Sequence, residues 1–271
     1  MLLSWLWAAA IAAVLAVVGL ALRAARRAPR RADLAIEAAI VFGLYSLWQE
    51  GGSLADNHVT GAIANARWVW HTQRLLHLPD EVDVQRLVLP DHLLVQGINV
   101  FYDVVHVPAL IAFLIWMYFR HRDTYARWRT IGAILTGACL LIQMIPVAPP
   151  RLLPQLGFVD TAALYHESVY TPGGIGDATQ LAAMPSVHVA WAAFIAVAVI
   201  SLSESRWRWL IVAHPAATLF VVVATANHWW LDGIVAIALL PASVAAFAGA
   251  GTLAQRLRRV PSPLADLPVP G

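Results

Sequence analysis

The chain has 271 residues, of which 60% are hydrophobic and 13% are charged, against roughly 25% charged residues in an ordinary soluble domain. Several apolar stretches of about 20 residues carry no charge, which excludes a soluble globular domain and a disordered chain. The net charge is only +2, and we expect no nucleic-acid partner.

Seven apolar segments predict an all-α polytopic membrane protein with about seven transmembrane helices. They cover residues 2–22, 34–50, 99–119, 130–148, 185–202, 209–227 and 229–250. The first is followed, not preceded, by positive charge, so it differs from a secretory signal peptide and we expect it to be retained as a helix.

The segments between the spans complete a single membrane domain over residues 1–260. Residues 51–98 carry Trp and His among apolar residues, so we expect an outer segment with helices lying in the membrane interface, near 59–78 and 81–95. Residues 149–184 are rich in Gly and Pro and predict a loop. The tail over 261–271 is expected to be disordered.

The distribution of arginine predicts the orientation of the spans. All 18 basic residues are Arg, and fourteen of them lie at 23–31, 120–129, 203–208 and after residue 250. Alternating crossings place these four regions on one side, which the positive-inside rule makes cytoplasmic. We therefore expect a bacterial plasma-membrane protein with its N-terminus outside and its C-terminus in the cytoplasm.

A first polar segment opens the last span. His228 and Asp232 are four residues apart and share a helix face. A carboxylate there can accept from one imidazole nitrogen and leave the other as a nucleophile or base. The alternative is a His and an Asp that face water at the membrane surface.

A second polar segment opens the fifth span. Pro185 suits the first turn of a helix, and Ser186 and His188 follow it. Free backbone N–H groups at such a helix start attract an anion, and His188 can give a proton to a leaving group. Ordinary capping by Ser186 is the alternative.

A third polar segment, Val147–Arg151, closes the fourth span, and Arg151 could anchor a lipid headgroup or clamp a phosphate. The predicted topology places all three segments on the outer face. Together they supply a cation, N–H donors, a proton donor and an oriented nucleophile, which phosphoryl transfer requires. No acidic cluster suited to Mg²⁺ accompanies them, so we expect neither a metal nor another cofactor.

A polar stripe marks the outer end of the third span. Asn99, Tyr102, Asp103 and His106 fall at i, i+3, i+4 and i+7. Polar residues on one face of a membrane helix usually point into the bundle or a wet cavity. They could bind the headgroup or acceptor of a substrate, or they could form hydrogen bonds between helices.

Two of these segments resemble motifs of a known family. AAMPSVHVAWA at 182–192 and NHWWLDGIVA at 227–236 resemble the second and third motifs of the type 2 phosphatidic acid phosphatase (PAP2) superfamily, and Val147–Arg151 lies where its first motif is expected. The resemblance covers roughly residues 95–250 and is closest to the branch with inositol phosphorylceramide and sphingomyelin synthases.

The resemblance implies a six-helix PAP2-like core and a metal-independent phosphohistidine mechanism. His228 matches the nucleophile, Asp232 its partner and His188 the general acid, while Arg151 and Ser186 match phosphate binders. The Lys of the first motif has no counterpart, and the Arg of the third motif is replaced by Val222.

The expected function is therefore an extracytoplasmic lipid-phosphate phosphatase, or a phosphotransferase that moves a phospho-headgroup to a lipid or polyol alcohol. Its partners would be a lipid phosphate or phospholipid substrate and membrane lipids. A transporter would spread its polar residues through several spans, whereas here they gather at one face. A metal hydrolase with His188, His228 and Asp232 as ligands would be inactivated by chelators.

Overall fold

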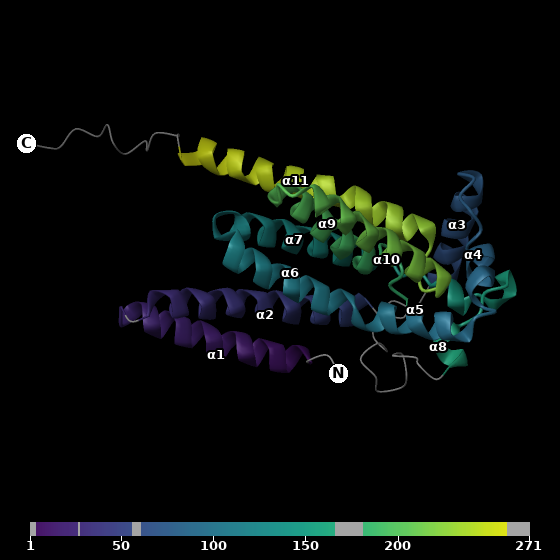
Figure 1. The fold of residues 1–271 in the computed structure, drawn as a ribbon, viewed down its shortest axis with the longest axis horizontal. Coiled ribbons are helices and arrows are strands. Elements are labelled where there is room, and N and C mark those ends of the chain that lie inside the picture. Colours follow the sequence, from purple (N-terminus) through teal and green to yellow (C-terminus); the bar gives the residue numbers. More distant parts are fainter. Residues whose placement is uncertain (1–3, 27, 56–60, 166–180, 259–271) are drawn as a thin grey trace, which may run out of the picture.

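The structure, a computed structural model, describes residues 4–26, 28–55, 61–165 and 181–258, and the predicted tail over 261–271 lies outside this range. Long helices run side by side, and short helices cover one end of them (Figure 1). The helices are α1 (Trp5–Ala24), α2 (Pro29–Ala55), α3 (Ala62–Leu75), α4 (Glu81–Val88), α5 (His92–Val104), α6 (His106–Arg120), α7 (Arg122–Gln143), α8 (Thr161–Leu164), α9 (Val187–Leu202), α10 (Ala213–Ala224) and α11 (Trp230–Arg258). Three 3₁₀ segments, η1 (Pro150–Leu152), η2 (Pro154–Leu156) and η4 (Arg206–Val212), connect them.

The protein is an all-α membrane protein, as the sequence predicts. Within the described ranges, three helical stretches are long and apolar enough to cross a membrane, namely Trp5–Ala24, Arg206–Ala224 and Trp230–Thr252. The bent pair α5 and α6 makes a fourth if it counts as one span, and α9 is a shorter apolar helix. Every one of the seven predicted segments contains a helix, although α2 and α7 do not meet this test.

The predicted third span differs most from the structure, because two helices, α5 and α6, replace the single helix expected over 99–119. They meet at a bend of 48°. Pro108 causes the break: it has no N–H to donate to the carbonyl of Val104, and its ring clashes with that carbonyl in a regular helix. The bend therefore falls after Val104, at the site end of the bundle.

Proline also sets two other boundaries that differ from expectation. The interfacial helix expected over 81–95 ends at Val88, before Pro90, and α5 then starts with Asp91 as its N-cap. The fourth span begins earlier than expected, at Arg122, and ends at Gln143, before Pro146. The Arg-rich joint between α6 and α7 is thus a single residue, His121.

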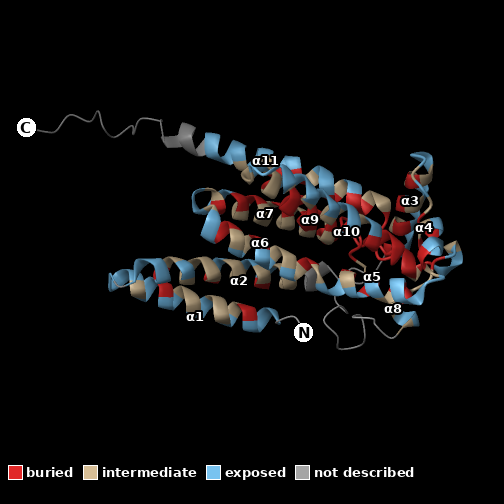
Figure 2. Cartoon of the chain, viewed as in Figure 1, coloured by how far each residue is buried: buried red, intermediate tan, exposed pale blue. Residues whose placement is uncertain are grey.

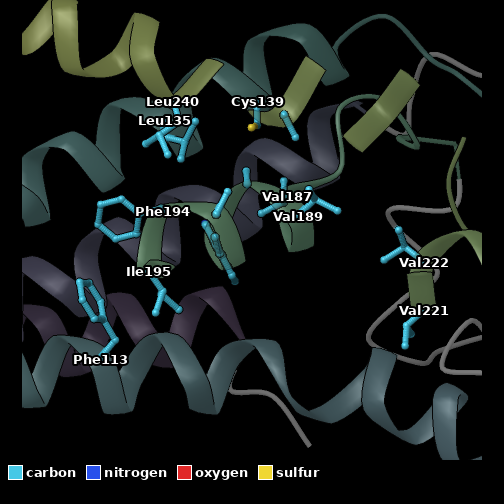
Figure 3. Close-up of a cluster of buried hydrophobic side chains, with 14 of the residues drawn as sticks. Phe113, Leu135, Cys139, Val187, Val189, Phe194, Ile195, Val221, Val222 and Leu240 are labelled. Carbon is cyan, nitrogen blue, oxygen red and sulfur yellow. The ribbon is translucent and has the colours of Figure 1, made fainter. Parts of the chain in front are cut away.

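Helix α9 lies at the centre of the core and is buried on most of its surface (Figure 2). It contacts α6, α7, α10 and α11. Phe194 packs edge-to-face on Phe113 of α6, and the core also includes Leu135 and Leu240 (Figure 3). Because His188 lies in the first turn of this helix, the core fixes its backbone.

The two ends of the bundle differ in chemistry. The α1–α2 and α6–α7 turns lie at one end, where Asp33 pairs with Arg23 and Arg122, and Glu37 pairs with Arg129. Helices α3, α4 and α8 lie at the opposite end (Figure 1). The predicted catalytic segments begin or end at that second end, so the arginine-rich turns and the candidate site are separated by the length of the bundle.

Candidate active site

The loop between α10 and α11 carries His228 into the protein. It turns sharply because the backbone N–H groups of Asn227 and His228 both donate to the carbonyl of Val222, at 3.1 and 3.0 Å. Ala226, at a φ of 55°, supplies the left-handed residue of this turn. The His228 side chain is buried, with the residue 5% exposed.

The hydrogen bonds of His228 determine which of its ring nitrogens is free. Nδ1 lies 2.7 Å from the carbonyl oxygen of Ala183 and 3.3 Å from Oδ2 of Asp232. Both of these atoms are acceptors, so Nδ1 carries the proton and Nε2 keeps its lone pair. Nε2 is buried and has no hydrogen-bond partner among the described residues. This arrangement prepares Nε2 to act as a nucleophile.

Asp232 holds the start of α11 together as well as orienting the imidazole. It is fully buried, and its Oδ2 accepts from the N–H of Trp229 at 2.8 Å. Its own carbonyl accepts from the N–H of Ser186 at 3.2 Å, which links α11 to the start of α9. A Cβ on the next residue, Gly233, would lie 2.5 Å from Leu219 of α10, so glycine permits this close packing.

Ser186 and His188 lie at the start of α9, as predicted. Ser186 is buried, and its hydroxyl oxygen caps the helix by accepting from the N–H of Val189. The ring of His188 lies 5.7 Å from that of His228, centroid to centroid. Its Nδ1 is buried, with no partner in the part of the chain that the structure describes. The N–H groups of the first helical turn face no intrahelical acceptor and can bind an anion.

The bend between α5 and α6 adds a third imidazole to this cluster. The His106 ring lies 4.4 Å from that of His188, and the Tyr102 ring lies 4.6 Å from it. Nδ1 of His106 donates to the Tyr102 carbonyl at 3.1 Å, which leaves the buried Nε2 as an acceptor. The bend thus places Tyr102 and His106 against His188, one of the two histidines predicted to be catalytic.

The other two residues of the polar stripe lie differently. Asn99 is buried, and its Oδ1 accepts from the hydroxyl of Thr161 in α8 at 3.0 Å. Asp103 is exposed. Because the helix ends at Val104, the stripe does not continue as one straight face to His106, and Asn99 helps to join α5 to α8.

Arg151 is hydrogen-bonded to the loop that carries His228. Its Nε donates to Oδ1 of Asn227 at 2.9 Å, and its backbone N–H donates to the carbonyl of Ala226. Nη1 lies 3.6 Å from Oδ2 of Asp160. The arginine is 6% exposed, so its charge acts in a poorly solvated site.

Two supporting side chains, Asn227 and Gln143, have contacts in the site that were not predicted from the sequence. Asn227 begins the motif at 227–236, but the sequence did not indicate its bond to Arg151. Gln143 donates through Nε2 to the carbonyls of Ala182 and Pro185, and so supports the turn whose Ala183 carbonyl orients His228. A lone Gln at the end of an apolar span was the only signal for it.

Two further side chains come from helices α3 and α4 and cap the start of α11. The N–H of Trp230 donates to Oε1 of Glu81 at 3.2 Å, and the N–H of Leu231 donates to Oε1 of Gln73 at 3.0 Å. Both side chains are buried, and Arg74 pairs with Glu81 at 3.1 Å. The segment predicted to lie in the membrane interface therefore also supports the start of the helix that bears Asp232.

Burial raises the pKa of Glu81, although the N–H groups of Glu81 and Trp230 and the charge of Arg74 oppose the change. The folded protein therefore binds more protons than the unfolded chain between the ordinary pKa, about 4.3, and the raised one. Stability falls as pH rises through this window. Glu81→Gln keeps the acceptor oxygen but cannot ionise, so we expect its stability not to fall in this window. The melting temperature of Glu81→Gln relative to that of the wild type should therefore rise with pH through the window and then level off.

Thermal unfolding in detergent between about pH 4 and pH 8 measures this difference. Asp83→Asn removes an exposed carboxylate from the same helix and should show no such trend. The expectation is contradicted if the difference in melting temperature between Glu81→Gln and the wild type stays constant with pH. It is also contradicted if the wild type is the more stable protein above the window.

The assembled site contains three imidazoles, one arginine and one buried carboxylate at one end of the bundle. Within the described ranges, no group of three or more His, Cys, Asp or Glu side chains is spaced to hold a metal ion. The groups that are present can attack an electrophile, transfer a proton and balance the charge of an anion.

Comparison with known proteins gave one family. A sequence model described as the PAP2 superfamily matches residues 67–246, which is more than half of the chain. The matched region includes all of the site residues described above, whereas α1 and α2 lie outside it. No curated protein and no solved structure shows a significant match.

Proposed function

Because this chain belongs to the PAP2 superfamily, its function is of the phosphatase or phosphotransferase type, and we propose that it acts on lipid phosphates through a phosphohistidine intermediate. The observation that carries the proposal is the state of His228. Its Nδ1 is bonded to the Ala183 carbonyl and near Asp232, so the lone pair lies on the buried Nε2.

In the first step, Nε2 of His228 attacks phosphorus, a P–N bond forms and the bond from phosphorus to the leaving oxygen breaks. His188 gives its proton to that oxygen. Arg151 and the N–H groups at the start of α9 balance the charge of the phosphoryl oxygens. As His228 becomes positive, the buried carboxylate of Asp232 stabilises it.

In the second step, a hydroxyl group attacks phosphorus and the P–N bond breaks. His188, now neutral, takes the proton of the attacking hydroxyl and returns to its starting state. Tyr102 and His106 lie against the His188 ring, and we assign them, with Asn99 and Asp103, to the region that receives the headgroup or acceptor. Water as acceptor gives a phosphatase, and an alcohol gives a transferase of the inositol phosphorylceramide synthase type.

The membrane setting supports a lipid substrate that is bound at the outer interface. The arginine-rich turns lie at the end of the bundle opposite the site (Figure 1). With those turns in the cytoplasm, the site faces the extracytoplasmic side. Val222, which replaces the expected arginine, is fully buried in the core. Fewer cations around the phosphate favour a specialised substrate over a broad phosphatase.

A substrate screen on purified protein tests the proposal. We expect release of inorganic phosphate from at least one lipid phosphate, inhibition by vanadate and full activity in the presence of a chelator. Adding candidate polyol or lipid alcohols and analysing the products separates hydrolysis from transfer. Loss of activity on chelation, or equal activity in a His228→Ala variant, would overturn the mechanism.

A further inference from the structure

An apolar cavity of about 540 Å³, partly open at the surface of the bundle, lies between α2, α6, α7 and α9. Its walls consist almost entirely of hydrocarbon and aromatic side chains. Trp48 of α2 and Trp191 of α9 both line it, with ring centroids 5.3 Å apart. The cavity is separate from the imidazole cluster, and the mechanism above does not use it.

The polar groups in the cavity wall already have partners inside the protein. The Thr136 hydroxyl donates to the Gly132 carbonyl and accepts from the indole N–H of Trp191. Arg129 pairs with Glu37, and the Tyr45 hydroxyl accepts from Gln49. A polar ligand would lose its hydration without gaining hydrogen bonds here, so the wall selects hydrocarbon.

Two helices that carry site residues, α6 and α9, also line the cavity. Val107, which lines it, follows directly after His106, and Trp191 lies on α9 three residues after His188, on the same face of the helix. Helices α6 and α9 both begin at the imidazole cluster and lead from it along the cavity. A molecule whose phosphate lies at His228 can therefore reach the cavity with its apolar part.

The dimensions of the cavity fit one hydrocarbon chain. Along α7 its wall runs from Arg129 to Leu140, which corresponds to about 16 Å of helix. One leaflet of a bilayer, half of the ~30 Å hydrocarbon core, holds acyl chains of about the same length. Several residues of the wall come from α2, which lies outside the matched family region.

We propose that this cavity binds one acyl chain of the lipid phosphate, with α2 forming one of its walls. The proposal rests on the proposed function for its phosphate end. The binding of a chain, however, can be measured without any turnover.

Two glycines provide a matched pair of variants. A Cβ at Gly137 on α7 or at Gly249 on α11 would meet nothing within 4 Å, so either helix accepts a larger residue. Only Gly137 lines the cavity. Gly137→Leu fills part of the cavity, while Gly249→Leu places the same side chain on an exposed helix face.

We expect Gly137→Leu to lower kcat/KM for dipalmitoyl phosphatidic acid by about tenfold, a loss equal to about 1.4 kcal/mol. Its kcat/KM for dibutyryl phosphatidic acid should stay within about twofold of the wild type, and Gly249→Leu should change neither value. An equal loss on both substrates, or no loss on either, would overturn the proposal.

A second measurement needs no activity. Phosphatidic acid with a photoreactive group near the end of one acyl chain is added to the protein and irradiated, and the labelled peptides are identified. We expect label in the parts of α2 and α6 that line the cavity, lost in Gly137→Leu and kept in Gly249→Leu. If the labelling of α2 and α6 is unchanged in Gly137→Leu, the cavity assignment is wrong. If the protein is labelled as expected but has no activity, only the proposed function is contradicted.

Discussion

Replacing His228 by alanine is expected to reduce turnover of a lipid phosphate by at least ~10⁴-fold while the protein stays folded. In the proposed mechanism Nε2 of His228 forms the bond to phosphorus, and among the described imidazoles of the site no other has two acceptors at its Nδ1. The measurement is phosphate release by purified protein, with thermal unfolding as the check on folding.

His71→Ala is the control, because it removes an exposed imidazole from the helices at the same end of the bundle. That variant should keep its activity. Added imidazole should restore part of the turnover of His228→Ala, since the cavity left behind can admit the free ring. The mechanism is refuted if His228→Ala retains activity, or if a trapped phosphoenzyme carries its phosphate on another residue.

The second large effect is expected for Asp232→Asn, which should lower kcat by about 10² to 10³-fold. A loss of ~10⁴-fold is typical where a carboxylate alone fixes the histidine tautomer. Here the Ala183 carbonyl also accepts from Nδ1 at 2.7 Å, so the tautomer survives the substitution. What is lost is the buried negative charge that stabilises the imidazolium during attack.

The ratio of kcat values for the wild type and Asp232→Asn measures this effect, and KM should change little. In the His228→Ala background the same substitution should cost nothing further, because the two residues act as a unit. A loss as large as that of His228→Ala would show that the Ala183 carbonyl does not maintain the tautomer.

The fold class could be predicted from the sequence because transmembrane helices carry their signal locally, in runs of apolar residues. The main differences arose at proline. Pro108 divides the third span and Pro90 separates α4 from α5, and a count of apolar residues does not register either break. The start of α7 at Arg122 was missed for a similar reason, since charged residues can occupy the first turns of a helix outside the membrane.

The candidate site was predictable as a set of residues but not as a set of contacts. His188, His228 and Arg151 were found because polar residues stand out in apolar sequence. The Ala183 carbonyl that orients His228 and the Asn227 amide that holds Arg151 depend on how distant segments pack. A backbone carbonyl has no residue type that would reveal it, so sequence could not supply these partners.

The capping of α11 by Glu81 and Gln73 has a consequence for how this protein can be recombined with its relatives. The two side chains come from more than 140 residues earlier in the chain, yet they satisfy the first N–H groups of the helix that bears Asp232. A chimera that exchanges α11 alone would leave those donors without their acceptors. Helices α3, α4 and α11 therefore form one unit of exchange, and functional chimeras should be built by transferring the three together.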